Sequence, residues 1–119
     1  MNEKECVRQF LKTFPEYKDE YDDHILQNGK LHIHVFFGEI NSLFLRTKLD
    51  EPEKAKAYFD YVERMNREGD EAVRKIVRRT ILERIKDEPD AWEVFAKTAS
   101  AEFVQQAQEI LEELGRSAQ

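Results

Sequence analysis

The sequence predicts an all-α fold: a compact bundle of about six to seven short helices in a single domain over residues 1–119. Apolar residues recur at helical spacing along most of the chain, charged residues make up 37% of it, and only 4 glycines and 3 prolines interrupt it. Such a charged fraction suits amphipathic helices whose outer faces contact water. Short turns between consecutive helices favour antiparallel packing, which is compatible with stacked helical hairpins.

The first two helices are expected before Gly29. Residues 3–13 carry an apolar stripe, and Asn2 can cap their first turn. Pro15 ends this helix and opens a second one that runs to about Gln27, because proline is tolerated in the first turn of a helix. Gly29 then provides a C-terminal stop.

Residues 30–36 alternate between apolar and histidine side chains, a pattern typical of a β-strand. No other segment alternates convincingly, and an unpaired strand would leave its backbone groups without hydrogen bonds. We therefore interpret residues 30–31 as a connector and residues 33–49 as a third helix, with a strand or a loop over 30–36 as the alternative. The third helix is apolar nearly all round, which predicts a central position in the bundle.

The fourth and fifth helices have clear boundaries. Pro52 opens the fourth helix and Gly69 ends it; Asp70 can cap the fifth helix, which Pro89 ends. The fifth helix has the clearest apolar face in the chain, made of Val73, Ile76, Val77, Thr80, Ile81 and Ile85.

The fourth helix carries an apolar arc wider than one packing face needs, and this arc includes Ala57 and Tyr61. It is either sandwiched between neighbouring helices or partly exposed as a contact surface. Two more helices complete the expected fold. Asp90 can cap a short one over residues 91–98, and Ser100 starts the last one, which Gly115 ends.

The net charge of −6 disfavours nonspecific nucleic-acid binding, which depends on lysine and arginine side chains that displace counterions from phosphate. It is compatible with a basic protein partner. The candidate contact residues form an acidic cluster in the second helix: Asp19, Glu20, Asp22 and Asp23. An ordinary solvated surface is the simpler interpretation of the same cluster.

Residues 70–88 have the opposite charge balance, with six bases against five acids. Lys75, Arg79 and Lys86 fall near one outer stripe of the predicted helix, with Leu82 between them. Such a stripe could meet an acidic helix or a phosphate group. It lacks interleaved aromatic residues and a helix-turn-helix frame, so a nucleic-acid-linked regulator is only an alternative to a solvated face.

Histidines supply the one candidate metal site. His32 and His34, with His24 nearby and Glu39 downstream, offer imidazole and carboxylate ligands for zinc or another divalent metal. Side chains at positions i and i+2 point about 200° apart on a helix, so this spacing chelates well only on a strand. We therefore expect no bound metal and no cofactor, with a metal-dependent enzyme or metal sensor as the alternative.

The single cysteine, Cys6, cannot form an internal disulfide, which fits a reducing compartment. It shares an apolar stripe with Val7 and Phe10, which indicates a buried structural thiol rather than a nucleophile. The N-terminus does not resemble a signal peptide, and no apolar run approaches the roughly 18 residues that span a bilayer. These features predict a cytoplasmic protein that does not contact membranes.

Two stretches resemble a family of small uncharacterised bacterial proteins, and the resemblance covers roughly the first half of the chain. They are Phe14-Pro15-Glu16-Tyr17 through Asn28-Gly29, and His34-Val35-Phe36-Phe37-Gly38-Glu39-Ile40. The resemblance implies an all-helical bacterial protein and brings over no catalytic residues. In size and charge alone, the chain is also similar to immunity proteins that neutralise bacterial toxins.

These observations favour a non-catalytic protein-binding module. We expect it to block a basic partner by shape and charge, as an immunity or antitoxin-like protein does.

Overall fold

The computed structural model describes residues 1–117, which form helices and connecting turns and contain no strand. The helices are α1 (Glu3–Thr13), α2 (Lys18–Asn28), α3 (Ile33–Thr47), α4 (Pro52–Glu68), α5 (Glu71–Lys75), α6 (Glu83–Asp87), α7 (Pro89–Thr98) and α8 (Ala101–Ser117). A 3-10 turn, η1 (Pro15–Tyr17), precedes α2, and a π-helical segment, η2 (Ile76–Leu82), joins α5 to α6 without a break. The described residues therefore form seven helical segments, and the all-α prediction is confirmed.

Several helix boundaries follow from local hydrogen bonds that the sequence predicts. The side chains of Asn2, Asp70 and Ser100 each accept a hydrogen bond from the amide three residues later, at 2.9, 3.0 and 3.1 Å. Gly29 ends α2 in the left-handed region, with a φ of 76°. The ambiguous segment resolves as a connector followed by α3, so the helical interpretation of the third element is confirmed.

Other boundaries differ from the prediction. Asp90 does not cap α7, because the helix already begins at Pro89 and Glu88 is its N-cap residue. Gly115 does not end α8, which continues to Ser117 since an isolated glycine is tolerated within a helix. Pro15 opens a 3-10 turn rather than the second α-helix itself, which begins at Lys18.

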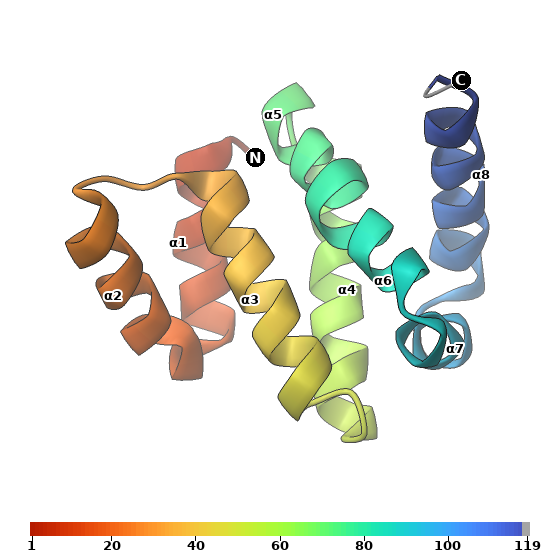
Figure 1. The fold of residues 1–119 in the computed structure, drawn as a ribbon, viewed down its shortest axis with the longest axis horizontal. Helices are drawn as coiled ribbons and strands as arrows, with labels where there is room; N and C mark the ends of the chain where they lie inside the picture. Colours follow the sequence, from red (N-terminus) through yellow and green to blue (C-terminus); the bar gives the residue numbers. More distant parts are fainter. Residues whose placement is uncertain (118–119) are drawn as a thin grey trace.

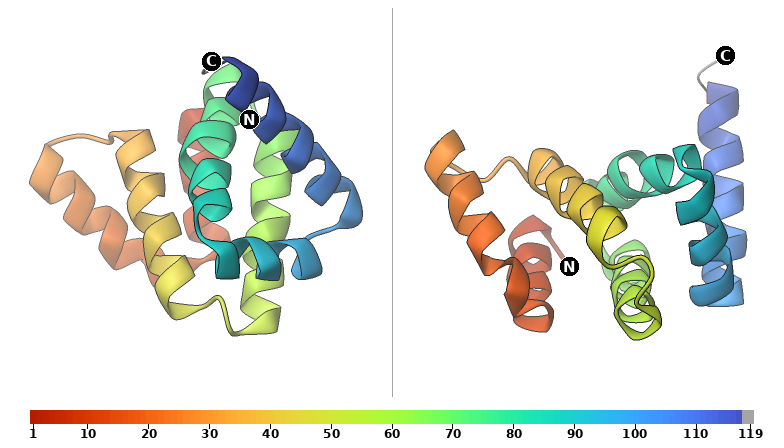
Figure 2. Two further views of the ribbon diagram at one scale, coloured as in Figure 1. Left: turned by 45° about the vertical axis from the view of Figure 1, so that its right-hand side comes forward. Right: turned by 60° about the horizontal axis from the view of Figure 1, so that its bottom comes forward.

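In Figure 1, α3 and α4 lie in the middle of the molecule, with α1 and α2 on one side and α7 and α8 on the other. In both further views, α2 lies at one edge of the molecule and α8 at the opposite edge (Figure 2). Aromatic side chains dominate the core between them. Eight are less than 2% exposed: Phe10, Phe36, Phe37, Phe44, Tyr58, Phe59, Phe95 and Phe103. None of the described helices combines the length and apolar character that crossing a bilayer requires.

The π-helical winding of η2 changes which side chains of the long helix face inward. Leu82 was expected on the outer stripe between the bases but is fully buried, whereas Thr80 is only half-buried. Bonding from residue i to i+5 adds a residue to the turn, so later side chains are displaced from their α-helical positions. The sequence pattern assumes α-helical spacing throughout and therefore misplaces Leu82.

Candidate functional site

The outer face of α2 combines an exposed leucine with carboxylates. Asp19, Asp22, Asp23 and Leu26 are spaced i, i+3, i+4 and i+7, so they share one face of the helix. Leu26 is 83% exposed, the highest exposure of any large apolar side chain among the described residues. A single exposed leucine is normal on a protein surface, so it is the combination with three acids on one face that makes α2 a candidate contact surface.

The opposite face attaches α2 to the bundle. His24 is buried, and its ring packs edge-to-face on Phe36 of α3 with the ring centroids 5.7 Å apart. Tyr21 also packs edge-to-face on Phe36, at 5.6 Å. Because these contacts hold α2 from one side only, its acidic face remains in solvent at the edge of the molecule (Figure 1).

The four acids of the predicted cluster have different surroundings. Asp22 forms an ion pair with Lys18, one turn earlier on α2. Asp19 and Asp23 are exposed and take part in no ion pair within residues 1–117. Glu20 lies toward the bundle: it is half-buried, and its Oε2 atom is covered without a hydrogen-bond partner. The negative charge available to a partner therefore centres on Asp19 and Asp23.

A hollow of about 220 Å³ opens where η1, the end of α3 and the start of α4 meet. We call it the aromatic hollow. Four rings line it, from Phe14, Tyr17, Phe44 and Tyr58. Its remaining lining residues are Glu16, Lys48, Glu53, Lys54 and Ala57. Since α2 begins directly after Tyr17, the aromatic hollow adjoins the first turn of the acidic face.

The rings of the aromatic hollow are held in place. Tyr58 stacks on Phe44 with the ring centroids 3.9 Å apart and the planes 18° apart. Its hydroxyl donates a 2.6 Å hydrogen bond to Oδ1 of the fully buried Asn41. Burial raises the pKa of the Tyr58 phenol well above its usual range, so this group stays a neutral donor. The hollow is thus preformed rather than dependent on rearrangement of its floor.

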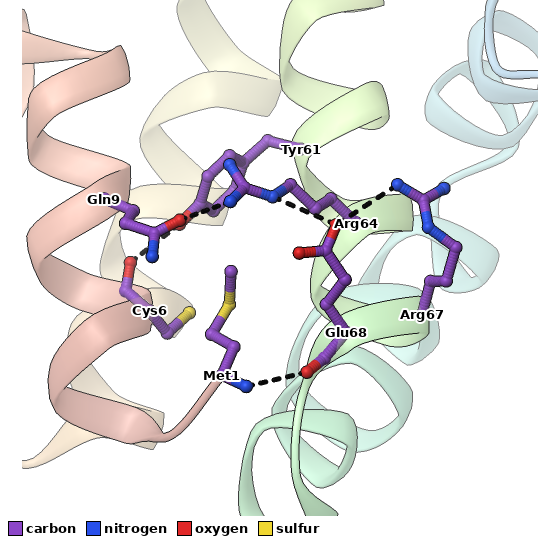
Figure 3. Close-up of polar contacts among 7 residues, drawn as sticks. All are labelled: Met1, Cys6, Gln9, Tyr61, Arg64, Arg67 and Glu68. Carbon is purple, nitrogen blue, oxygen red and sulfur yellow. Dashed lines mark hydrogen bonds and ion pairs between the residues drawn. The ribbon is translucent and has the colours of Figure 1, made fainter.

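A second hollow, of about 490 Å³, lies between α1 and α4 and is lined by Arg8, Gln9, Lys12, Thr13 and Arg64. We call it the basic hollow. Arg64 is fixed from both sides, because its Nη2 donates to Gln9 Oε1 at 2.6 Å and its Nε donates to Glu68 Oε2 at 3.2 Å (Figure 3).

The contacts below the basic hollow tie the start of the chain to the end of α4. The Met1 amino group donates to the Glu68 carbonyl oxygen at 2.8 Å, and the Tyr61 hydroxyl donates to the Cys6 carbonyl oxygen at 2.7 Å (Figure 3). Arg67 also contacts the Glu68 carboxylate, at 3.3 Å. These bonds show that Arg64 and Arg67 are used in contacts that stabilise the fold.

The structure places His24 beside both His32 and Glu39 but turns His34 away from them. His24 Nε2 accepts a 3.0 Å hydrogen bond from the His32 amide, so its lone pair is already used. His34 turns away to Thr80, with its Nδ1 atom 3.0 Å from the Thr80 hydroxyl. Glu39 Oε2 lies 3.7 Å from His24 Nδ1. Within residues 1–117, no three histidine, cysteine, aspartate or glutamate side chains come close enough to hold a metal.

Cys6 is fully buried, and burial raises the pKa of its thiol to about 12. A thiol with this pKa is a poor nucleophile near neutral pH, because the thiolate is the reactive form. Its surroundings are those of a structural core residue.

Lys75 and Arg79 are exposed on the outer side of the long helix, one turn apart. Arg79 borders a small hollow with Arg78 and Glu113 of α8. An acid therefore lies beside the base that would have to bind phosphate, which weakens the case for nucleic acid at this stripe.

Sequence reasoning missed Leu26 and the aromatic hollow. The i+7 spacing of Asp19 and Leu26 is visible in the sequence and could have revealed the first. The aromatic hollow had only an indirect signal, the wide apolar arc of α4. There, Tyr61 is buried while Ala57 is exposed beside the hollow, so the small side chain leaves the space open.

Comparison with known proteins identifies the family of the chain. No curated protein and no solved structure matches it significantly. One family model matches residues 7–113, well beyond the two stretches on which the sequence resemblance rests. The chain belongs to this family, which is described as a domain of unknown function, DUF7674.

Proposed function

We propose that this protein is a non-catalytic binding module that docks a basic protein on the outer face of α2. The observation that carries the proposal is the 83% exposed Leu26 among Asp19, Asp22 and Asp23. An apolar side chain that continues a row of acids on one helix face is compatible with an interface in which an apolar centre is bordered by polar groups.

The charges and the anchor have separate tasks in this proposal. Rim carboxylates attract a basic surface and set the association rate, which falls as salt screens them. Leu26 sets the lifetime of the complex, because a buried leucine removes apolar area from water. In its narrower form, the proposal places this binding in the cytoplasm and the partner is a basic toxic protein that the complex inhibits.

A capture experiment with three tagged proteins tests the proposal in a lysate of the source cell. The α2 variant combines Asp19→Lys and Asp23→Lys with Leu26→Ala, all at exposed positions. A control combines Glu109→Lys with Glu112→Lys on α8, which makes the same change of charge elsewhere.

We expect the unmodified protein and the control to retain a basic protein at low salt and to lose much of it at high salt. The α2 variant should lose it at both salt concentrations while keeping its helical circular dichroism spectrum. Capture of an acidic protein, equal capture by the α2 variant, or no capture at all would contradict the proposal. Rescue of growth by co-expression with the captured protein tests the narrower form.

A further inference from the structure

We infer that the aromatic hollow is the site for an arginine side chain of the basic partner. This inference rests on the proposed function and names the chemistry that would anchor the partner. It follows from three properties of the hollow: its space, its walls and the charges at its rim.

The space suits a flat side chain. About 220 Å³ is more than the roughly 150 Å³ that admits a benzene ring in a protein cavity. Ala57 borders the hollow from α4 and is exposed, so no longer side chain of the protein fills the opening.

The walls suit a cation with an apolar stem. The faces of aromatic rings attract cations, and a guanidinium can also stack flat against them. Tyr17 and Phe14 contribute rings from η1 and the residue before it, and the Phe14 ring packs edge-to-face on Tyr58 of the stacked pair, with the centroids 6.4 Å apart. The methylene groups of an arginine would lie against these rings, as long basic side chains do on apolar surfaces.

The rim charges select a cation rather than a neutral apolar group. Lys48 and Lys54 both contact Glu51, each at 3.4 Å, so the two lysines are partly neutralised. Glu16 and Glu53 border the hollow and form no ion pair within the part of the chain that the structure describes. Two unengaged carboxylates are thus available to receive the forked donors of a guanidinium.

The pKa of the Tyr17 phenol is a second indication that the electrostatic potential in the aromatic hollow is negative. Burial, with a smaller contribution from the carboxylates of Glu16, Glu20 and Glu51, raises this pKa to about 12. Three acids from two separate segments therefore act on one ring of the hollow. Negative potential of this kind favours a positively charged occupant.

Titration with two small probes tests this inference by amide NMR spectroscopy of the 15N-labelled protein. The probes are N-acetyl-arginine amide and N-acetyl-citrulline amide, which differ by the charge of the terminal group. We expect the arginine probe to shift amides of η1 and the first turns of α4 and to bind about tenfold more tightly than the citrulline probe, within the range of a cation over aromatic rings.

Three variants locate the interaction. Ala57→Leu should fill the hollow and abolish the shifts, and Glu16→Gln with Glu53→Gln should remove the preference for arginine over citrulline. Ala96→Leu adds the same volume at an exposed position of α7 and should change nothing. Equal binding of both probes would show an apolar site instead, and shifts that survive Ala57→Leu would place the site elsewhere; either result overturns the inference.

The basic partner distinguishes failure of this inference from failure of the proposed function. If the α2 variant loses the partner and Ala57→Leu does not, only the arginine site is wrong. If Ala57→Leu loses the partner and the α2 variant does not, the docking face on α2 is wrong. If both variants retain the partner, both proposals are wrong.

Discussion

The two hollows beside α4 differ in charge although they lie along the same face of one helix. Ala57 borders the aromatic hollow and Arg64 borders the basic hollow. Seven residues separate them, so they lie two turns and about 10 Å apart on one side of α4. Tyr61 lies between them, buried, with its hydroxyl bonded to α1. The residues that α4 presents at each turn therefore decide what each hollow can bind.

The two hollows also differ in how far the fold already uses their charged groups. The aromatic hollow is a preformed site, whereas the basic hollow is structural. The aromatic hollow has a floor of buried, stacked rings, and its free charges lie at the rim. In the basic hollow, Arg64 is already engaged by Gln9 and Glu68. Lys12 lies in the last turn of α1, where the helix dipole favours cations without any ligand. A charged side chain in a hollow indicates a ligand only when it is not already bonded to other residues of the fold.

The largest effect is expected at the floor of the aromatic hollow, in Tyr58→Phe. Removing the hydroxyl leaves the buried Asn41 side chain without its partner, and Asn41 Nδ2 already lacks one. We expect the free energy of unfolding to fall by about 1–3 kcal/mol, the cost of an unsatisfied buried polar group. Urea denaturation measures it.

Two further variants sharpen that result. Tyr21→Phe, at a half-buried ring, should stay within about 0.5 kcal/mol of the unmodified protein. Adding Asn41→Leu to Tyr58→Phe should recover part of the loss, because both polar groups are then gone. Equal losses in Tyr58→Phe and Tyr21→Phe would show that the bond to Asn41 does not stabilise the floor.

The next effect is a loss of stability at high pH. It concerns Cys6, whose carbonyl oxygen accepts the hydrogen bond of Tyr61 between the two hollows. Burial raises the pKa of Cys6 from 9.0 to about 12, so the folded state keeps a proton that the unfolded chain loses. The resulting stability is fully present below pH 9 and is lost as the pH rises toward 12, by about 1.4 kcal/mol per pH unit at most.

Cys6→Ala should therefore move the onset of alkaline destabilisation from about pH 9 to about pH 10, where the tyrosines of the unfolded chain begin to ionise. Urea midpoints between pH 7 and 11 give the comparison. An unchanged onset would mean that Cys6 is not protected from titration in the folded protein.

Prediction from the sequence is most accurate where contacts within one helical turn determine the structure. The starts of α1, α5 and α8 depend on side chains that bond amides three residues away, and Gly29 ends α2 by its own φ. The π-helical segment depends on packing that no local pattern contains, so the sequence pattern misplaces Leu82.

The same distinction holds for the candidate site. The acids of α2 were identified from the sequence, but the inward position of Glu20 depends on how α2 packs against the bundle. The aromatic hollow needs residues 14, 17, 44 and 58 to converge from three segments, which helical periodicity assigns only to separate apolar stripes. A hollow is a property of contacts between elements, and no single element encodes it.

Among residues of the two hollows, the smallest effect is expected for Arg64→Gln, and it decides whether the basic hollow is structural. The substitution removes the bond of Arg64 to Gln9, which links α1 to α4, and its ion pair with Glu68 within α4. Because the Arg64 side chain is 40% exposed, water and salt screen it, and we expect a loss of only about 0.5–1 kcal/mol in the free energy of unfolding.

Lys97→Gln breaks the more exposed ion pair with Glu93 and should cost less, about 0–0.5 kcal/mol. Repeating both measurements in 1 M salt should reduce the Lys97 effect toward zero and leave part of the Arg64 effect, since the bond to the neutral Gln9 does not depend on a charge pair. A Lys97 effect equal to the Arg64 effect at both salt concentrations would mean that Arg64 does not tie the helices together, and the cations of the basic hollow would then need another explanation.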